Sequence, residues 1–242
     1  MCRTEESFKN HMDACIKLWY YGYEVIDMKD FPVFTTENGV ASLVLREVPY
    51  KGIAFVTLQD SLRPEQLLIE CANFCRAVGA KQVYATGNDI LTEYPQAVTI
   101  CQMKCPRDNI GDSDAALYPV TEQTIETFRN LYNEKMSRIP IAETMTRDDG
   151  IKLLEGGAGY FVHRGQDLLG IGIIEGQTLK AIASARPGVG AEVMRALCGG
   201  LFSDTVVLEV ASTNEPALRL YKKLGFYKTA ELLTWYDVTN CV

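Results

Sequence analysis

Between residues 179 and 237 the chain alternates between extended and helical periodicity, and this alternation constrains the fold more than any other feature. A strand–helix–strand crossover makes its two strands parallel and is right-handed in nearly all known cases. The sequence therefore predicts a sheet with a parallel pair of strands and helices on its faces. The expected elements are strands at 179–185, 205–211 and 226–237, a helix from the glycine turn to about 201, and a helix at 215–224.

The residues before this stretch predict antiparallel hairpins and two more helices. Thr121 and Thr146 stand where helices begin, because threonine caps helix N-termini. The expected strands are 117–120, 159–164 and 168–175, with helices at 122–136 and from 146 to 156–157. The order β-α-α-β-β-β-α-β-α-β describes an α/β fold with a mixed sheet.

A glycine-rich turn joins the strand at 179–185 to the next helix, with the sequence Ala185-Arg186-Pro187-Gly188-Val189-Gly190-Ala191. Glycines at 188 and 190 remove Cβ atoms, so the backbone can approach a ligand closely. The amides of Val189, Gly190 and Ala191 then point outward from a helix N-terminus, which favours binding of an anion such as a diphosphate. A glycine pair before a helix often only starts the helix, and that interpretation is equally compatible with this segment alone.

A second segment follows the strand at 205–211 and reads Asn-x-x-Ala-x-x-Leu-Tyr-x-x-x-Gly-Phe. Its residues are Asn214, Ala217, Leu220, Tyr221, Gly225 and Phe226. Together with the glycine turn about 25 residues upstream, it resembles the acyl-CoA-binding motif of GNAT N-acetyltransferases, and the resemblance covers roughly residues 115–238. The family's turn begins with Gln or Arg, whereas this chain has Ala185 there and Arg186 next to it.

The resemblance implies the GNAT fold and transfer of an acetyl group from the cosubstrate acetyl-CoA to a primary amine of a small molecule or peptide, by direct attack in a ternary complex. It implies that pantetheine lies along residues 179–185, where two parallel strands splay apart. Tyr221 is then the acid near the departing sulfur. The residues expected to hold the cosubstrate are Ala183, Ala185, Arg186, Gly188, Val189, Gly190, Ala191, Asn214, Ala217 and Tyr221.

A base must remove a proton from the acceptor ammonium. Glu209 in Leu-Glu-Val is the first candidate, and a similar Leu-Glu-Val occurs in protein N-terminal acetyltransferases of this superfamily. Glu175 is second and His163 third. Glu209 can equally be a glutamate on the solvent side of a strand. Lys222 and Lys223 are interpreted as solvated helix charges rather than as ligands of the CoA 3′-phosphate.

Structural roles also explain much of the second motif. Asn214 caps helices well, and Gly225 is a typical helix C-cap. Ala217, Leu220 and Tyr221 follow the spacing of a core stripe. These roles do not explain why position 221 is Tyr rather than Leu, because a buried phenol hydroxyl needs a polar partner.

The first half, residues 1–106, repeats part of the same order of elements. Its expected elements are a helix at 5–20, strands at 23–28, 41–47 and 52–58, a helix at 63–78, and strands at 81–86 and 97–104. It lacks both motifs, and Asp60 stands where phosphates would bind. We expect a degenerate GNAT-like or accessory domain that shapes the acceptor pocket or completes the sheet. The polar segment 106–114 is the expected linker to the second domain, 115–242.

Composition excludes several classes of function. The net charge of −7 gives no basic footprint for nucleic acid. No apolar run of about 18 residues predicts a membrane span, and without a signal-like N-terminus we expect a cytoplasmic monomer or homodimer. Cys71/Cys75 and Cys101/Cys105 share a four-residue spacing, but zinc sites favour tighter knuckles, so core thiols and no metal are expected.

Three classes of function remain open. An amine acetyltransferase explains both motifs. A non-catalytic acyl-CoA-binding or sensor module would keep the glycine turn without needing Tyr221. A nucleotide-binding protein would use the turn alone, but the Lys-Ser/Thr of a P-loop is missing from it.

Overall fold

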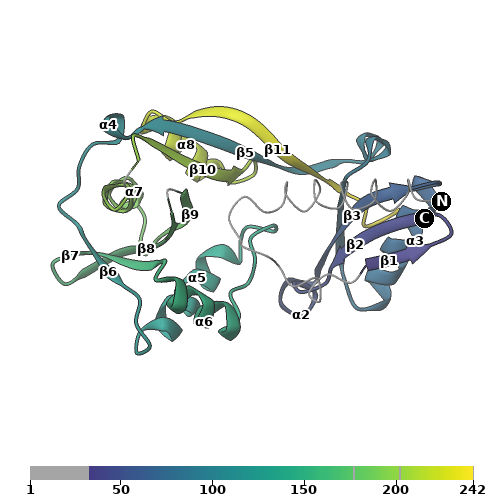
Figure 1. The fold of residues 1–242 in the computed structure, drawn as a ribbon, viewed down its shortest axis with the longest axis horizontal. Helices are drawn as coiled ribbons and strands as arrows, with labels where there is room; N and C mark the ends of the chain where they lie inside the picture. Colours follow the sequence, from purple (N-terminus) through teal and green to yellow (C-terminus); the bar gives the residue numbers. More distant parts are fainter. Residues whose placement is uncertain (1–32, 177, 202, 242) are drawn as a thin grey trace, which may run out of the picture. The chain divides into compact units, whose positions relative to one another are not determined.

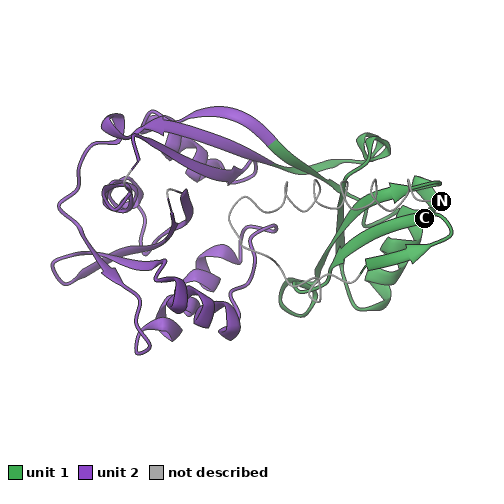
Figure 2. Ribbon diagram, in the orientation of Figure 1, with its two compact units in different colours: residues 1–99, 232–242 green, residues 100–231 purple. Residues whose placement is uncertain are grey.

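The computed structural model describes residues 33–241 with the exception of 177 and 202. The chain forms two compact units (Figure 2): unit 1 is residues 1–99 with 232–242, and unit 2 is residues 100–231. The helix expected at 5–20 and the strand expected at 23–28 lie outside the described residues.

Unit 2 is built on a mixed sheet with the strand order β6-β7-β8-β9-β10-β5-β11 (Figure 1). The pairs are antiparallel between β6 and β9 and between β10 and β5, and β9 and β10 are parallel. The strands are β5 (Gln96–Pro106), β6 (Ala116–Pro119), β7 (Gly159–Arg164), β8 (Asp167–Glu175), β9 (Thr178–Ser184), β10 (Thr205–Ala211) and β11 (Tyr227–Asp237).

The expected order of elements over the second half is confirmed. The helices are α5 (Ile125–Met136), α6 (Arg147–Gly156), α7 (Gly190–Gly199) and α8 (Glu215–Lys223). Thr146 caps α6 in a reciprocal capping box with Asp149. Helix α5 begins at Ile125 rather than at 122, because residues 122–124 form a turn in which Thr124 Oγ1 accepts a hydrogen bond from the Thr121 amide.

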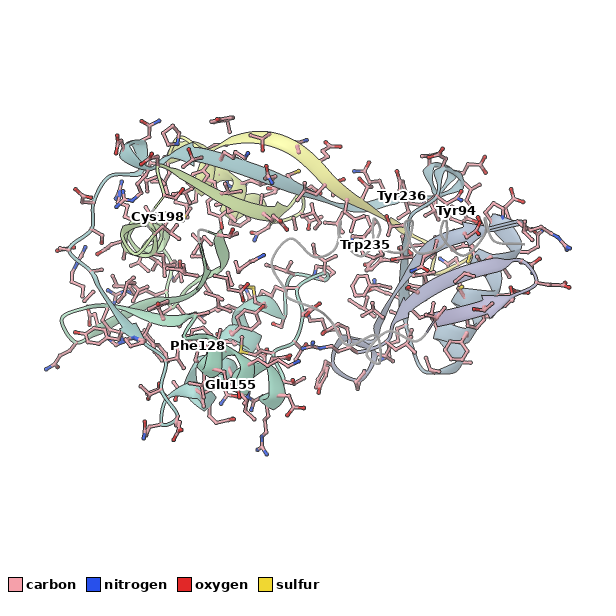
Figure 3. The ribbon with its side chains drawn as sticks, viewed as in Figure 1. Tyr94, Phe128, Glu155, Cys198, Trp235 and Tyr236 are labelled. Atoms are coloured by element: carbon pink, nitrogen blue, oxygen red, sulfur yellow. The ribbon has the colours of Figure 1, made fainter. Side chains whose placement is uncertain are left out.

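The helices of unit 2 cover opposite faces of the sheet (Figure 1). Helices α7 and α8 pack on one face, in a core that includes Leu179, Leu208 and Tyr221. Helices α5 and α6 pack on the other face, where the core includes Phe128 and Ala183. Figure 3 labels Cys198 on α7 and Phe128 on α5, one from each core. A side chain of the sheet therefore faces either α7 and α8 or the side of α5 and α6.

Unit 1 contains an antiparallel meander, β1-β2-β3, followed by a parallel crossover from β3 through α3 to β4. Its elements are β1 (Val33–Thr36), β2 (Gly39–Val44), α2 (Val48–Lys51), β3 (Ile53–Ser61), α3 (Pro64–Ala77), β4 (Gln82–Thr86) and the 3-10 helix η2 (Asp89–Glu93). The two-residue turn Glu37-Asn38 joins β1 to β2. Helix α3 packs on the meander through Leu67, Leu68 and the thiols of Cys71 and Cys75.

Each half of the chain supplies its last strand to both units. The unit boundaries fall within β5, after Thr99, and within β11, before Leu232. Residues 100–106 of β5 pair with β10 along its whole length, so the first half completes the sheet of unit 2. At the C-terminal end of β11, Tyr236 and Asp237 pair with β4.

The segment 106–114, expected to be a linker, packs against unit 2 instead. It contains the short helix α4 (Arg107–Ile110), and Ile110 is buried in the core under α7. Arg107 Nε donates to the Cys198 carbonyl over 2.9 Å, and Arg195 Nε donates to the Ile110 carbonyl over 3.0 Å. These contacts explain why the division between units precedes this polar stretch.

Candidate functional site

The parallel strands β9 and β10 stay paired over only two positions. Thr178 pairs with Val207, and Leu179 pairs with Leu208. Beyond them, β9 continues to pair with β8 as far as Ser184, and β10 continues to pair with β5 as far as Ala211. The two strands therefore diverge from this vertex, and the backbone edges that face each other beyond it are not joined by a ladder.

A β-bulge lies at the point where the strands separate. Ile174 pairs with Leu179 and Ile173 pairs with Ala181, so Lys180 is an extra residue on β9. Bulges bend the strand that carries them and increase its local twist. The bulge thus provides a physical reason for β9 to turn away from β10 directly after Leu179.

The glycine turn lies at the far end of the diverging β9. Gly188 adopts φ +88°, and a Cβ placed on it would meet open space. A Cβ on Gly190 would lie 3.0 Å from Leu220 Cδ2, so this glycine lets the start of α7 approach α8. Among the described residues, no acceptor takes a hydrogen bond from the amides of residues 188–191. Four adjacent amides at the start of a three-turn helix form a site for an anion.

Two cationic side chains flank this turn. Arg186 Nη2 lies 3.3 Å from Asp167 Oδ2, in an exposed ion pair with the first residue of β8. Lys135 Nζ, from the last turn of α5, donates to the Ala185 carbonyl over 3.3 Å. Ala185 has a backbone role, because its amide donates to the Leu169 carbonyl over 2.8 Å. Positive charge is therefore present next to the free amides even though Ala185 replaces the family's Gln or Arg.

Tyr221 lies on α8 in the core on the face of α7, with only 8% of its surface exposed. Its ring is tilted against Phe226 at a centroid distance of 5.7 Å. Burial raises the pKa of the Tyr221 phenol to about 12, and the nearby Cys198 thiol acts in the same direction. A phenol with this pKa is protonated at neutral pH. Because its hydroxyl has no hydrogen-bond partner among the described residues, it is available as a donor.

Asn214 and Ala217 have the structural roles that the motif also allows. Asn214 caps α8, and its Oδ1 accepts from the Ala217 amide over 3.3 Å. Ala217 packs against the core that contains Tyr221. Gly225 follows α8 with φ +92°. The motif thus fixes the start and end of the helix that positions the phenol.

Glu209 is the first residue of β10 beyond the last pair with β9, and its side chain is exposed. Its neighbours Leu208 and Val210 are buried in the core under α7 and α8. Successive strand residues point to opposite faces, so Glu209 faces the side of α5 and α6, away from Tyr221. The structure therefore places the acid candidate and the first base candidate on opposite faces at the diverging strands.

Of the other predicted residues, some lie near the diverging strands and some do not. Glu175 pairs with Thr178 next to the vertex, and its Oε2 is buried without a donor among the described residues. His163 lies on β7 beside Tyr118, two strands away from β9 in the sheet order, so it is not brought to the site. Lys222 and Lys223 are exposed in the last turn of α8.

Sequence reasoning missed the bulge at Lys180 and the contact of Lys135 with the turn. Neither carries a local signal, because a bulge depends on the register of β8 and the lysine comes from a helix far earlier in the chain.

Within the described part of the chain, no group of three or more His, Cys, Asp or Glu side chains could hold a metal ion. No described helix is long and apolar enough to cross a bilayer.

Comparison with known proteins relates the fold to solved structures. No protein-family model and no curated protein matches the sequence. A conserved protein of unknown function from Enterococcus faecalis V583, named a probable N-acyltransferase, aligns with a TM-score of 0.61 at 11% identity, over 97% of this chain and 70% of that one. A GCN5-related N-acetyltransferase from Anabaena variabilis ATCC 29413 aligns with a TM-score of 0.60 at 13% identity, over 94% and 66%. The fold is that of the GNAT acetyltransferases.

A further solved structure with the same architecture is a functionally unknown conserved protein from Staphylococcus epidermidis ATCC 12228. Its TM-score is 0.52 at 9% identity, over 88% of this chain and 96% of that one. At such low identities the likeness shows the GNAT fold and not the reaction. The chemistry must therefore be argued from this chain's own residues.

Proposed function

We propose that the second half of the chain, residues 115–238, is an N-acetyltransferase that moves the acetyl group of acetyl-CoA to a primary amine by direct attack. The observation that carries the proposal is the divergence of β9 and β10 after Leu179 and Leu208. Four free amides lie at the end of the diverging β9, and a buried phenol lies on one face. An extended pantetheine arm has amides that can pair with such an open strand edge.

The turn is suited to the diphosphate of CoA. Gly188 supplies the positive φ and leaves open space where a side chain would stand. The amides of residues 188–191 donate, the N-terminus of α7 adds its dipole, and Arg186 adds a charge. Its pair with Asp167 is exposed, so little energy holds the arginine away from a phosphate.

Tyr221 stabilises the departing sulfur by donating a hydrogen bond. A thiol has an ordinary pKa of about 8.5, well below the pKa of about 12 that burial gives this phenol. Full proton transfer from the phenol to the thiolate is therefore uphill. The side chain acts as a fixed donor to the negative charge that develops as the carbon–sulfur bond breaks, in a site with little water.

Glu209 accepts the proton that the acceptor ammonium must lose, directly or through water. The location of Glu209 and Tyr221 on opposite faces of the sheet supports separate roles for the two side chains. A carboxylate also attracts a cationic amine before it is deprotonated.

For the first half, we propose a degenerate GNAT-like domain that has lost CoA binding. The support is its order of elements: an antiparallel meander, then the parallel crossover β3–α3–β4, then η2 where the second half has α8. Apart from the four-residue helix α2 between β2 and β3, this repeats the order β7-β8-β9-α7-β10-α8 of unit 2. The repetition is one of architecture only.

Binding of acetyl-CoA, followed by amine-dependent thiol release, tests the proposed function. A ligand bound only by the native state at 100 times its Kd stabilises by about 2.7 kcal/mol, so a clear rise in Tm is expected. Thiol release that depends on an added amine then shows transfer. A rise in Tm without turnover on any amine would favour an acyl-CoA sensor, and no rise at saturating acetyl-CoA contradicts the proposal.

A further inference from the structure

The face of the sheet that carries Glu209 has an ordered set of polar side chains around the vertex. On β5, Met103 and its neighbours Cys101 and Cys105 are buried under α7 and α8, so Gln102 and Lys104 face the other side. Gln102 pairs directly with Glu209, and Lys104 pairs directly with Val207. These residues all belong to unit 2.

One row of directly paired residues crosses four strands at the vertex. It runs from Glu175 on β8 through Thr178 on β9 and Val207 on β10 to Lys104 on β5. Strands lie about 4.8 Å apart, so the row has a carboxylate at one end, an ammonium at the other, and small side chains between them. Glu209 lies one pleat further along β10 on the same face.

The hydrogen-bonding groups of this face are not used up within the protein. Thr229 Oγ1 donates to Gln102 Oε1 over 2.9 Å, which fixes the amide and leaves its NH2 group to donate elsewhere. In the part of the chain that the structure describes, neither Lys104 nor Glu209 forms an ion pair. Glu175 has a buried oxygen without a donor.

We propose that this face is the acceptor site and that it selects an amine that also carries a carboxylate, as a free amino acid does. The proposal rests on the proposed function. Glu209 holds the ammonium of the acceptor beside the vertex, and Lys104 and the Gln102 amide hold its carboxylate. Glu209 lies directly opposite Gln102 and diagonally opposite Lys104. Directly opposed side chains have Cβ atoms about 5 Å apart and diagonal ones about 7–8 Å, a spacing that a small zwitterion can bridge.

The reaction balances with the groups present. The ammonium gives one proton to Glu209 or water, and its nitrogen forms a bond to the acetyl carbon. The nitrogen then gives a second proton to solvent as the carbon–sulfur bond breaks. The thiolate leaves with the hydrogen bond of Tyr221 and takes up a proton from solvent. The product is an N-acetyl amino acid, which keeps the carboxylate but loses the cation.

A comparison of acceptors tests this selectivity. The probes are the twenty common amino acids, the corresponding amino-acid amides, and ethanolamine as an amine without a carboxylate, each assayed by thiol release from acetyl-CoA. At least one amino acid should have a kcat/KM at least tenfold above that of its own amide. Lys104→Gln should raise KM for that amino acid about tenfold or more and leave the kinetics of the amide unchanged, whereas Lys104→Arg should restore much of the preference.

Lys152→Gln on α6 is the matched control, because Lys152 is an exposed lysine distant in sequence from these strands. Amides or ethanolamine used as well as the amino acids would overturn the proposal and leave the proposed function intact. An equal loss on all acceptors in Lys104→Gln, with unchanged acetyl-CoA binding, would also overturn it, because it would assign Lys104 a structural role. Failure to bind acetyl-CoA at all would overturn the proposed function itself.

Discussion

Each unit contains one parallel pair of strands joined by a strand–helix–strand crossover, and the two pairs differ at the point where a ligand could enter. In unit 1, β3 and β4 pair without interruption from Ile53 with Gln82 to Thr57 with Thr86. Beyond this ladder, Gly87 fits so closely that a Cβ on it would lie 2.4 Å from the Leu58 carbonyl oxygen. In unit 2 the corresponding pair, β9 and β10, separates after two positions.

The first turns of the two crossover helices, α3 and α7, also differ in how well they could bind an anion. Helix α3 begins with Pro64, which has no amide hydrogen. Helix α7 begins at Gly190, two residues after Gly188, and presents free amides. A strand–helix–strand crossover therefore gives both units a parallel pair of strands but does not by itself make a binding site. In unit 2, the bulge, the divergence of β9 and β10, and the glycine turn are what allow the pair to accept an anionic, extended ligand.

The largest expected effect comes from removing the hydroxyl of Tyr221, the phenol on α8 beside the diverging strands β9 and β10. Tyr221→Phe should lower kcat by about 100-fold or more, because one fixed donor to a developing charge contributes on that scale. The affinity for acetyl-CoA should remain unchanged in calorimetric titration. Tyr84→Phe is the matched control. Tyr84 is also buried and burial raises its pKa, but it lies on β4, which pairs with β3 without interruption. Equal losses in both variants would contradict the assignment.

The next largest effect is expected on the affinity for acetyl-CoA when the glycine turn is changed. In Gly188→Val, a branched residue at φ +88° is strained by about 1–3 kcal/mol, and its side chain occupies the space assigned to the diphosphate. The Kd for acetyl-CoA should rise about 30-fold or more, which corresponds to about 2 kcal/mol. Gly165→Val is the control, because Gly165 also has positive φ with open space around it but lies in the β7–β8 turn. Unchanged binding in Gly188→Val would exclude the turn as the anion site.

How much of this was accessible from the sequence varies from residue to residue. Strands β7 and β10 and the capped helix α6 were predicted with their observed bounds, because alternation, a capping threonine and Gly157 are local signals. The short edge strand β1 was not predicted, since four residues show little periodicity. The bulge at Lys180 and the sharing of β5 and β11 depend on register between distant strands, which no local pattern encodes.

A smaller effect should appear in the alkaline stability of the protein. The pKa of Tyr221 is about 12 in the folded state and about 10 when unfolded, so the unfolded state loses this proton first. The stabilisation is complete below pH 10 and is lost as the pH rises from about 10 to 12. The wild type should lose about 1.4 kcal/mol relative to Tyr221→Phe between pH 9 and 11, as measured by urea unfolding. A difference that stays constant to pH 11 would show that the phenol is not buried.

The smallest effect is expected for the exposed arginine beside the turn. Arg186→Gln should weaken acetyl-CoA binding about threefold at low salt, and the difference should shrink at high ionic strength, because exposed charges are screened. Titration at two salt concentrations measures it. Arg219→Gln, which breaks an exposed pair with Glu215 on α8, is the control and should bind as the wild type does. A threefold loss that does not depend on salt would assign Arg186 a packing role.

Hydrogen–deuterium exchange with and without saturating acetyl-CoA tests the difference between the two strand pairs most directly. Peptides that cover residues 180–191 should become protected, because the open edge of β9 and the amides of the turn gain partners, while peptides that cover 53–63 should exchange as before. Protection of residues 53–63 instead, or no change at 180–191 when the ligand is bound, would contradict the assignment of β9 and β10 as the acetyl-CoA site.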